Sequence, residues 1–399
     1  MNDRRICYNC FQSYYPEELL GICPECPAER DPQLELYYKF ALAVPPRFPL
    51  GGTEGSGGEA GELKCSRGHL TPLRACPHCH AQVQLSWSDP GRVLALVGPG
   101  ASGKSTYIGA LLEQLSRYPQ LCFHSYGLTM DPASEGAFNQ VRDYMFGANT
   151  FPLATQNAMA GTDLPTPIVS QLILPAPMGI MRLPRFFRTR FKPDVMVPLV
   201  FYDYPGEGFV NHDTPLVRYA AMAEGLMLAV DATVLPHVEL REGCPKPSPG
   251  KIRAEGLDPL ELVRTMTDAV RARVDRAGMR GVKIDKPVAV MLLKADEVPA
   301  LKPTLQAMLD RRKEEGERRR YPARLVDANH DAGARFLRDW GAGGLLEVLE
   351  LNFTSVKVFP VVAAWRDAPS EKRIRANWNA VGIEEPLYWL LTQLGYFRI

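Results

Sequence analysis

Residues 92–106 read RVLALVGPGASGKST, and this stretch decides the fold that we expect for the chain. It opens with a short apolar run that ends at Gly98, which is typical of a buried parallel strand. The residues after the run match the pattern GxxxxGK[ST] in full: Gly98, Pro99, Gly100, Ala101, Ser102, Gly103, Lys104 and Ser105. A helix is expected over 103–117, because three leucines there share one face. A strand, a glycine-rich loop and a helix in this order predict a phosphate-binding loop.

The chemistry of this loop follows from its residue types. Glycines let backbone N–H groups turn inward around an anion, and the N-terminus of the helix adds a partial positive charge. We expect Lys104 to reach the β- and γ-phosphates and Ser105 to ligate Mg²⁺. The residues that bind the nucleotide here are expected to be Gly98, Gly100, Ala101, Ser102, Gly103, Lys104, Ser105 and Thr106.

Downstream of the loop, strands and helices alternate. Apolar runs predict strands at 168–174, 195–203, 225–231, 286–296 and 355–365. Segments with helical signals lie between most of them, whereas 130–167 shows turn residues and little periodicity. Repeated strand–helix alternation predicts an α/β fold with a doubly wound, mainly parallel sheet.

Two further short motifs end predicted strands. Asp203-Tyr-Pro-Gly206 matches DxxG, in which the aspartate serves the Mg²⁺ site and the glycine N–H meets the γ-phosphate. Lys294-Ala-Asp296 resembles the last three positions of [NT]KxD, whose aspartate accepts hydrogen bonds from N1 and N2 of guanine. Ala363 ends the last strand, where a small residue can turn its N–H toward the guanine O6.

With these four elements in order, residues 92–399 resemble the phosphate-loop GTPases of the translation-factor and small-GTPase class. The resemblance implies binding of GTP with Mg²⁺ and its hydrolysis. With seven cysteines in the first 79 residues and the strings DYPGE (203–207) and GLMLAVD (225–231), the chain looks most like the bacterial double-GTPase families of conflict (defence) systems. That narrower likeness implies a protein partner, either a second GTPase or an effector.

The chain departs from the family pattern at three places. Leu293 replaces the usual Asn or Thr, so one hydrogen bond on the base side is missing. Glu207 follows the DxxG glycine where many members carry a water-orienting glutamine. Two interpretations stay open: Glu207 polarises water as a base, or the intrinsic rate is low until a partner binds. Thr166 has the best position for the switch threonine that ligates Mg²⁺, and Thr162 is the alternative. The expected catalytic residues are therefore Glu207, Lys104 and Thr166.

The cysteines are distributed unevenly: seven of the nine lie in the first 79 residues. Two CxxC pairs, Cys7/Cys10 and Cys23/Cys26, have spacing that suits a tetrahedral Zn²⁺ site. A second set offers Cys65, His69, Cys76 and Cys79, with His78 and His80 as substitutes for His69. We expect two closed, structural zinc sites, paired sequentially as the simpler arrangement, while cross-braced pairing remains open.

These patterns give a domain organisation. Zinc ribbons are expected at 1–30 and 63–88, joined by a partly flexible linker at 31–62 that contains GGTEGSGG. The nucleotide domain is expected over 89–399, with insertions at 130–167, 178–194, 236–258 and 297–345. Closed metal sites favour recognition or scaffolding as the role of the ribbons.

Composition excludes several classes of function. The formal net charge is +1, which excludes a generally basic surface that coats nucleic acid. No signal peptide and no membrane span are expected, which favours a cytoplasmic location where clustered cysteines bind metal. Residues 181–192 mix arginines with phenylalanines, and we favour a packed hairpin or a protein-binding surface there over a nucleic-acid contact.

The sequence therefore favours a GTP-binding protein that hydrolyses GTP slowly and acts as a molecular switch. Its switching segments are expected at 130–167 and 203–213. Two alternatives stay open. One is an ATP-dependent phosphate-loop enzyme, and the other is a non-enzymatic adaptor that binds protein or nucleic acid through the zinc ribbons, with the nucleotide only stabilising it.

Overall fold

The structure is a computed structural model of the chain. It describes residues 5–38, 43–49, 64–71, 73–83, 93–99, 101–117, 127–130, 132–151, 168–175, 194–201, 215–244, 258–276, 282–315, 323–365 and 380–396. The described residues form two compact units, one before residue 92 and one after it. No helix in these ranges combines the length and the apolar composition that crossing a membrane requires.

The first unit is built from very short strands. Its main sheet is antiparallel, in the order β6-β3-β7-β8, with strands β3 (Leu20–Ile22), β6 (Arg47–Pro49), β7 (Leu73–Ala75) and β8 (Gln82–Val83). Two smaller pairs join β1 (Arg5–Ile6) to β2 (Ser13–Tyr14) and β4 (Glu29–Arg30) to β5 (Ala43–Val44). The unit also holds η1 (Pro16–Glu18) and the helix α1 (Pro32–Tyr38).

The core of this first unit is small. Tyr14, Leu19, Leu34 and Ala81 pack around four buried cysteines, Cys7, Cys10, Cys76 and Cys79. A core of this size buries too little apolar surface to fold a chain of this length unaided. The cysteines themselves must therefore contribute to stability.

The second unit contains a four-stranded parallel sheet in the order β15-β14-β13-β9. Its strands are β9 (Leu94–Val97), β13 (Gly225–Asp231), β14 (Ile284–Leu293) and β15 (Phe353–Pro360). Every residue of β13 is buried, as expected for a strand covered on both faces. This sheet confirms the α/β fold with parallel strands that the sequence predicts.

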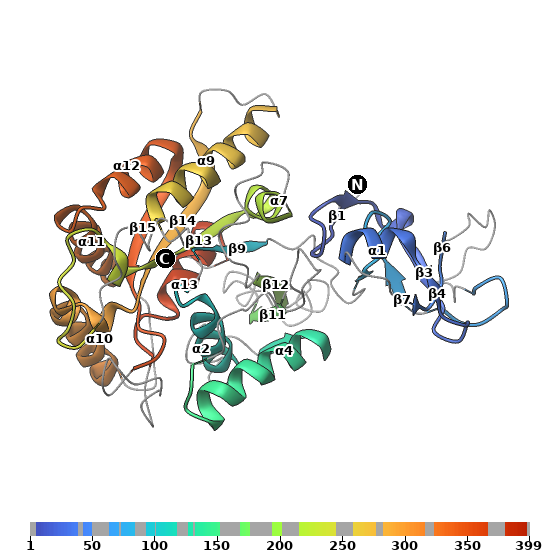
Figure 1. Ribbon diagram of the computed structural model, residues 1–399, viewed down its shortest axis with the longest axis horizontal. Helices are drawn as coiled ribbons and strands as arrows, with labels where there is room; N and C mark the ends of the chain where they lie inside the picture. The colour runs from blue at the N-terminus through green and yellow to red at the C-terminus, as the bar shows by residue number, and fades with distance from the viewer. Residues whose placement is uncertain are drawn as a thin grey trace, which may run out of the picture. The chain divides into compact units, whose positions relative to one another are not determined.

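Helices cover both faces of the parallel sheet. The apolar cluster that contains α2 (Lys104–Arg117) and α13 (Glu385–Gln393) includes Met227 and Ala229, the alternate residues of β13. Leu226 and Leu228 point the other way and are equally buried. Figure 1 shows α2 on one side of the sheet and α9 (Pro259–Arg276) and α12 (Gly343–Asn352) on the other.

The remaining elements complete the second unit. An antiparallel sheet has the order β10-β11-β12, with β10 (Gly127–Met130), β11 (Ile168–Pro175) and β12 (Asp194–Phe201). The other helices are α4 (Pro132–Arg142), α7 (Pro215–Met222), α10 (Lys302–Glu315) and α11 (Ala323–Asp339). Short helical turns are η2 (Asp143–Gly147), η4 (Ala232–Val234), η5 (Ala295–Glu297) and η6 (Pro299–Leu301).

The helix α4 lies in a stretch where the sequence showed little periodicity. It is placed by close packing on α2, because a Cβ at Gly109 would lie 2.6 Å from Val141 Cγ1 and 2.8 Å from Met145 Sδ. Gly109 thus lets two helix backbones approach. Phe138, Val141 and Met145 are three and four positions apart, so they lie on one helix face. This face packs in the apolar cluster that contains α2.

Gly109→Ala is expected to destabilise the protein, because overpacking costs about 1–3 kcal/mol and exceeds the gain of up to ~1 kcal/mol from better helix propensity. Gly136→Ala in α4 is the matched control, because a Cβ there has no atom within 4 Å. It should stabilise by up to ~1 kcal/mol. Chemical unfolding of both variants measures the difference, and shifts of the same sign would contradict this packing.

Candidate metal centres and nucleotide site

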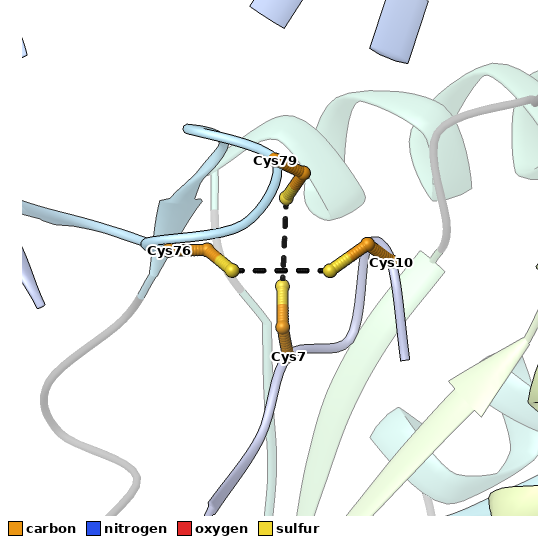
Figure 2. Close-up of side chains that lie close together, drawn as sticks. All are labelled: Cys7, Cys10, Cys76 and Cys79. Atoms are coloured by element: carbon orange, nitrogen blue, oxygen red, sulfur yellow. Dashed lines mark hydrogen bonds between the residues drawn. The ribbon is translucent and has the colours of Figure 1, made fainter. Parts of the chain in front are cut away.

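The first candidate metal group brings together the two ends of the cysteine-rich segment. Cys7, Cys10, Cys76 and Cys79 form one group, with Sγ–Sγ distances of 3.7 Å between Cys7 and Cys79 and 3.8 Å between Cys10 and Cys76. Figure 2 shows the four sulfurs pointing toward one another, two from each loop. All four residues are buried.

The second group contains three thiols and one imidazole. Cys23, Cys26, Cys65 and His69 come together, and His69 Nδ1 lies 3.5 Å from both Cys23 Sγ and Cys26 Sγ. The two alternative histidines have other partners: His78 Nε2 lies 3.1 Å from Ser13 O, and His80 Nδ1 lies 2.9 Å from the Asp31 carboxylate. His69 is therefore the imidazole of this group.

The expected sequential pairing of the ligands is wrong. Each group takes one pair of ligands from residues 7–26 and one from residues 65–79, so the sets are interleaved. The cause is the pairing of β3 with β7, which places Cys23, directly after β3, and Cys76, directly after β7, at opposite ends of two antiparallel strands. The spacing of the cysteines allows both arrangements, because each CxxC turn supplies two ligands and can combine with either of the later ligand pairs.

The geometry of both groups suits Zn²⁺. Sulfurs ~2.3 Å from one ion at tetrahedral angles lie about 3.8 Å apart, and a sulfur and an imidazole nitrogen about 3.5 Å apart. The observed 3.7, 3.8 and 3.5 Å agree with these values. Zn²⁺ in each group would crosslink two distant chain segments, and thiolate and imidazole are the ligands that it prefers.

The two turns of the first group have the same backbone. Phe11 N–H donates to Cys7 O at 2.8 Å and His80 N–H to Cys76 O at 3.0 Å. Phe11 and His80 both adopt the left-handed conformation, with φ of 55° and 56°. This conformation is unfavourable for residues other than glycine, so the turns are held in place by their surroundings.

The phosphate loop follows β9 and leads into α2, as the motif requires. Gly98 has no room for a side chain, because a Cβ there would lie 2.7 Å from Ala229 O. Ala101 and Gly103 have positive φ angles of 54° and 98°. Positive φ angles at these points let the loop turn into the N-terminus of α2, where backbone N–H groups would face a bound anion.

Two polar side chains are buried in this loop. Lys104 is 5% exposed, and its Nζ donates to Gly98 O at 2.9 Å and Pro99 O at 2.5 Å. Among the described residues, the buried Ser102 hydroxyl has no hydrogen-bond partner. An ammonium held inside the loop and an unsatisfied hydroxyl both suit a phosphate ligand, which would accept hydrogen bonds from each.

Lys294 connects the turn that follows β14 to the loop between β9 and α2. Its Nζ donates to Asp231 Oδ2 at 2.5 Å and to Ala101 O at 3.0 Å. Asp231 also accepts hydrogen bonds from the N–H and the hydroxyl of Thr233, at 2.9 and 2.6 Å. Lys294 has a φ of 57°, so the chain turns sharply where β14 ends.

The other predicted base-side residues lie at the same edge of the sheet. Asp296 belongs to η5, directly after Lys294. The ends of β14 and β15 are joined by Val361 N–H to Leu292 O at 2.9 Å, and Ala363 follows two residues later. Leu293 is buried, and its Cδ1 would lie 3.7 Å from a Cβ at Gly103. An apolar side chain thus packs at the position where the [NT]KxD pattern has Asn or Thr.

Sequence reasoning missed a set of contacts on Glu297. Arg241 N–H donates to Glu297 O at 2.8 Å, and the Arg241 guanidinium lies 3.5 Å from its carboxylate. The Cys244 thiol donates to the same carboxylate. Burial first, and then the Glu297 carboxylate, raise the pKa of Cys244 to about 11, so the thiol stays protonated at neutral pH. Cys244 is 53 positions from Glu297 in the sequence. No motif links the two residues, so the sequence offered no signal.

Several predicted residues lie outside the described ranges. They are Gly100 in the phosphate loop, the threonines Thr162 and Thr166, and the DxxG segment with Asp203, Gly206 and Glu207. The arginine- and phenylalanine-rich residues 181–192 lie outside them as well. Ser105 and Thr106 are described and occupy the first turn of α2.

No protein-family model matches the sequence, and no curated protein matches it. Similar solved structures include the signal recognition particle receptor SRb-GTP/SRX complex from Chaetomium thermophilum, with 14% identity, coverage of 70% of this chain and 93% of that chain, and a TM-score of 0.27.

Two other similar structures are longer than the region they share with this chain. The S. cerevisiae Ski7 GTPase-like domain, bound to GTP, shows 14% identity, covers 77% of this chain and 51% of that chain, and has a TM-score of 0.30. The bacterial selenocysteine-specific elongation factor EF-Sec shows 12% identity and a TM-score of 0.25. The match covers 77% of this chain and 29% of that chain. At TM-scores this low, the function must be inferred from the residues of the chain itself.

Cobalt spectra distinguish the interleaved pairing from the sequential one. With Co²⁺ in place of Zn²⁺, Cys76→Ser should remove the spectrum of the all-thiolate site and keep that of the site with three thiolates and His69. Sequential pairing would give the opposite result, because Cys76 would then share its ion with His69. Cys244→Ser is the control, since Cys244 belongs to neither group, and both spectra should persist in it.

Proposed function

We propose that the chain binds GTP with Mg²⁺, hydrolyses it slowly and acts as a molecular switch. The observation that carries this proposal is the Lys294 ammonium, which bonds both Asp231 and the phosphate-loop carbonyl of Ala101. A lysine with a purely structural role would not need to bond both the Asp231 carboxylate and the Ala101 carbonyl. A lysine that aligns a base-reading turn with a phosphate site needs them, because a nucleotide spans the two.

Each described residue then has a specific role. The N–H groups of residues 101–106, the N-terminus of α2 and Lys104 would hold the β- and γ-phosphates. Asp296 would accept hydrogen bonds from N1 and N2 of guanine, and the Ala363 N–H would meet the O6. Adenine presents the reverse pattern of donors and acceptors at these positions, so the same residues would disfavour it.

We assign the hydrolytic roles to residues named from the sequence. Ser105, Asp203 and Thr166 would hold Mg²⁺, which neutralises charge on the phosphates when it is bound. The Gly206 N–H would contact the γ-phosphate, and Glu207 would orient or polarise the attacking water. A carboxylate next to the γ-phosphate is repelled unless it is protonated, which supports a slow intrinsic rate.

The first unit would provide partner recognition. Its two metal groups contain four ligands each, so neither keeps an open position for catalysis. We propose that they hold Zn²⁺ and present a rigid surface to a protein partner, which could be a second GTPase or an effector. The cytoplasm, where free thiols persist, is the compartment that suits these ligands.

Nucleotide titration tests the proposal. The wild-type chain should bind GTP at least ~100-fold more tightly than ATP, and Asp296→Ala should lose most of this preference, because hydrogen bonds to a charged group contribute about 1.5–3 kcal/mol each. Lys104→Ala should weaken binding of both nucleotides and abolish phosphate release. Lys302→Ala is the control, because Lys302 is exposed at the start of α10 and should change neither.

Three outcomes would contradict parts of the proposal. Equal or tighter binding of ATP would remove the role of Asp296 and favour an ATP-dependent enzyme. Normal triphosphate binding by Lys104→Ala would remove the role of the phosphate loop. Binding of GTP without any phosphate release, also in the presence of candidate partners, would favour a non-enzymatic adaptor.

A further inference from the structure

Glu297 is held by both ends of one tight turn. Cys244 N–H donates to Arg241 O at 3.0 Å, and Gly243 between them has a φ of 84°. From one end of this turn, Arg241 N–H donates to Glu297 O at 2.8 Å, and the Arg241 Nη2 lies 3.5 Å from Glu297 Oε2. From the other end, the Cys244 thiol donates to the same carboxylate oxygen. A buried carboxylate, on a residue that is 5% exposed, is thus paired with a cation and a thiol.

Glu297 also ends the short turn that carries Asp296. Glu297 N–H donates to Lys294 O at 3.0 Å and closes this turn. Lys294, at its first position, is bonded to the Asp231 carboxylate. Asp296 therefore lies between two anchored residues, and both anchors come from the segment 231–244 that follows β13.

The buried carboxylate of Glu297 cannot leave its partners without a large cost. Moving away from the cation and the thiol would leave a charge uncompensated in the protein interior. Arg241 and Cys244 thus fix where Glu297 can lie, and the backbone of Asp296, one residue earlier, moves with it. On the other side of the turn, Leu293 is apolar and its side chain forms no hydrogen bond. The contacts of Glu297 supply a constraint that the [NT]KxD pattern lacks in this chain.

We propose that Glu297 is a positioning residue that holds Asp296 against the guanine base and thereby sets the preference for GTP over ATP. This inference rests on the proposed function. Asp296 can accept hydrogen bonds from N1 and N2 only when both are in reach, and hydrogen bonds weaken steeply when they are misaligned. The phosphate loop belongs to β9 and α2, outside this turn. A shift of Asp296 should therefore weaken binding of GTP and leave binding of ATP, which is held by its phosphates, unchanged.

The test compares Glu297→Ala with Glu113→Ala. Glu113 is the matched control, because it is also a buried glutamate, 4% exposed, and pairs with an arginine, Arg117, near the end of α2. In Glu297→Ala the ratio of GTP to ATP affinity should fall about 5- to 10-fold, as expected when most of one hydrogen bond to a charged group is lost. ATP affinity should stay within about two-fold. Glu113→Ala should keep both quantities, while both variants lose thermal stability.

A conservative variant separates positioning from a general loss of stability. The amide oxygen of Glu297→Gln has the same reach and can still accept from the Cys244 thiol, whereas the ion pair with Arg241 is lost. Glu297→Gln should therefore give a GTP to ATP ratio between those of the wild type and Glu297→Ala. A ratio that falls in this order supports the inference.

The outcomes separate this inference from the function it rests on. A wild-type chain that does not prefer GTP to ATP would overturn both. A preference that Asp296→Ala removes and Glu297→Ala keeps would overturn the inference alone, as would equal weakening of GTP and ATP binding by Glu297→Ala. If Glu297→Ala does not fold, Arg241→Met decides, because the Arg241 side chain is 33% exposed on a loop. A lower GTP to ATP ratio at unchanged ATP affinity then supports the inference, and an unchanged ratio overturns it.

Discussion

One ammonium group joins the ends of three neighbouring strands. Ala101 follows β9, Asp231 ends β13 and Lys294 follows β14, and these strands are adjacent in the parallel sheet. Lys294 Nζ bonds both the Asp231 carboxylate and the Ala101 carbonyl. Ligands of open α/β sheets bind at the carboxyl ends of the strands, so this interaction lies where a nucleotide would bind. It also holds Ala101 and Lys294, two strained residues with positive φ, in their conformations.

The sequence predicted the parts of this arrangement that short motifs specify. Lys104 and Lys294 were placed correctly, at the start of a helix and at the end of a strand, because the apolar runs before them are unambiguous. Asp231 was read only as a strand residue, since one carboxylate at a strand end has no motif. Glu297 was missed for a related reason, because its partners lie in a loop that is distant in the sequence.

In the first unit, the spacing of cysteines along the sequence identifies the candidate ligands but does not predict how they are grouped. The sequence predicted the eight residues of the two candidate metal groups, but their division into two groups was predicted wrongly. Each CxxC turn is a local structure, whereas the division depends on which strands pair, here β3 with β7. Interleaved groups also make the unit cooperative, since each ion would hold both the early and the late segment. The small core of this unit makes such crosslinks necessary.

A double-mutant cycle on Lys294 and Asp231 tests the central claim most directly. GTP affinity is measured for the wild type, Lys294→Met, Asp231→Asn and the double variant. If the ion pair aligns the base-reading turn with the phosphate loop, each single variant binds GTP more weakly, and the double variant is no weaker than the worse single one, with a coupling energy of about 1–3 kcal/mol. Additive losses, or single variants that bind GTP as the wild type does, would contradict the claim.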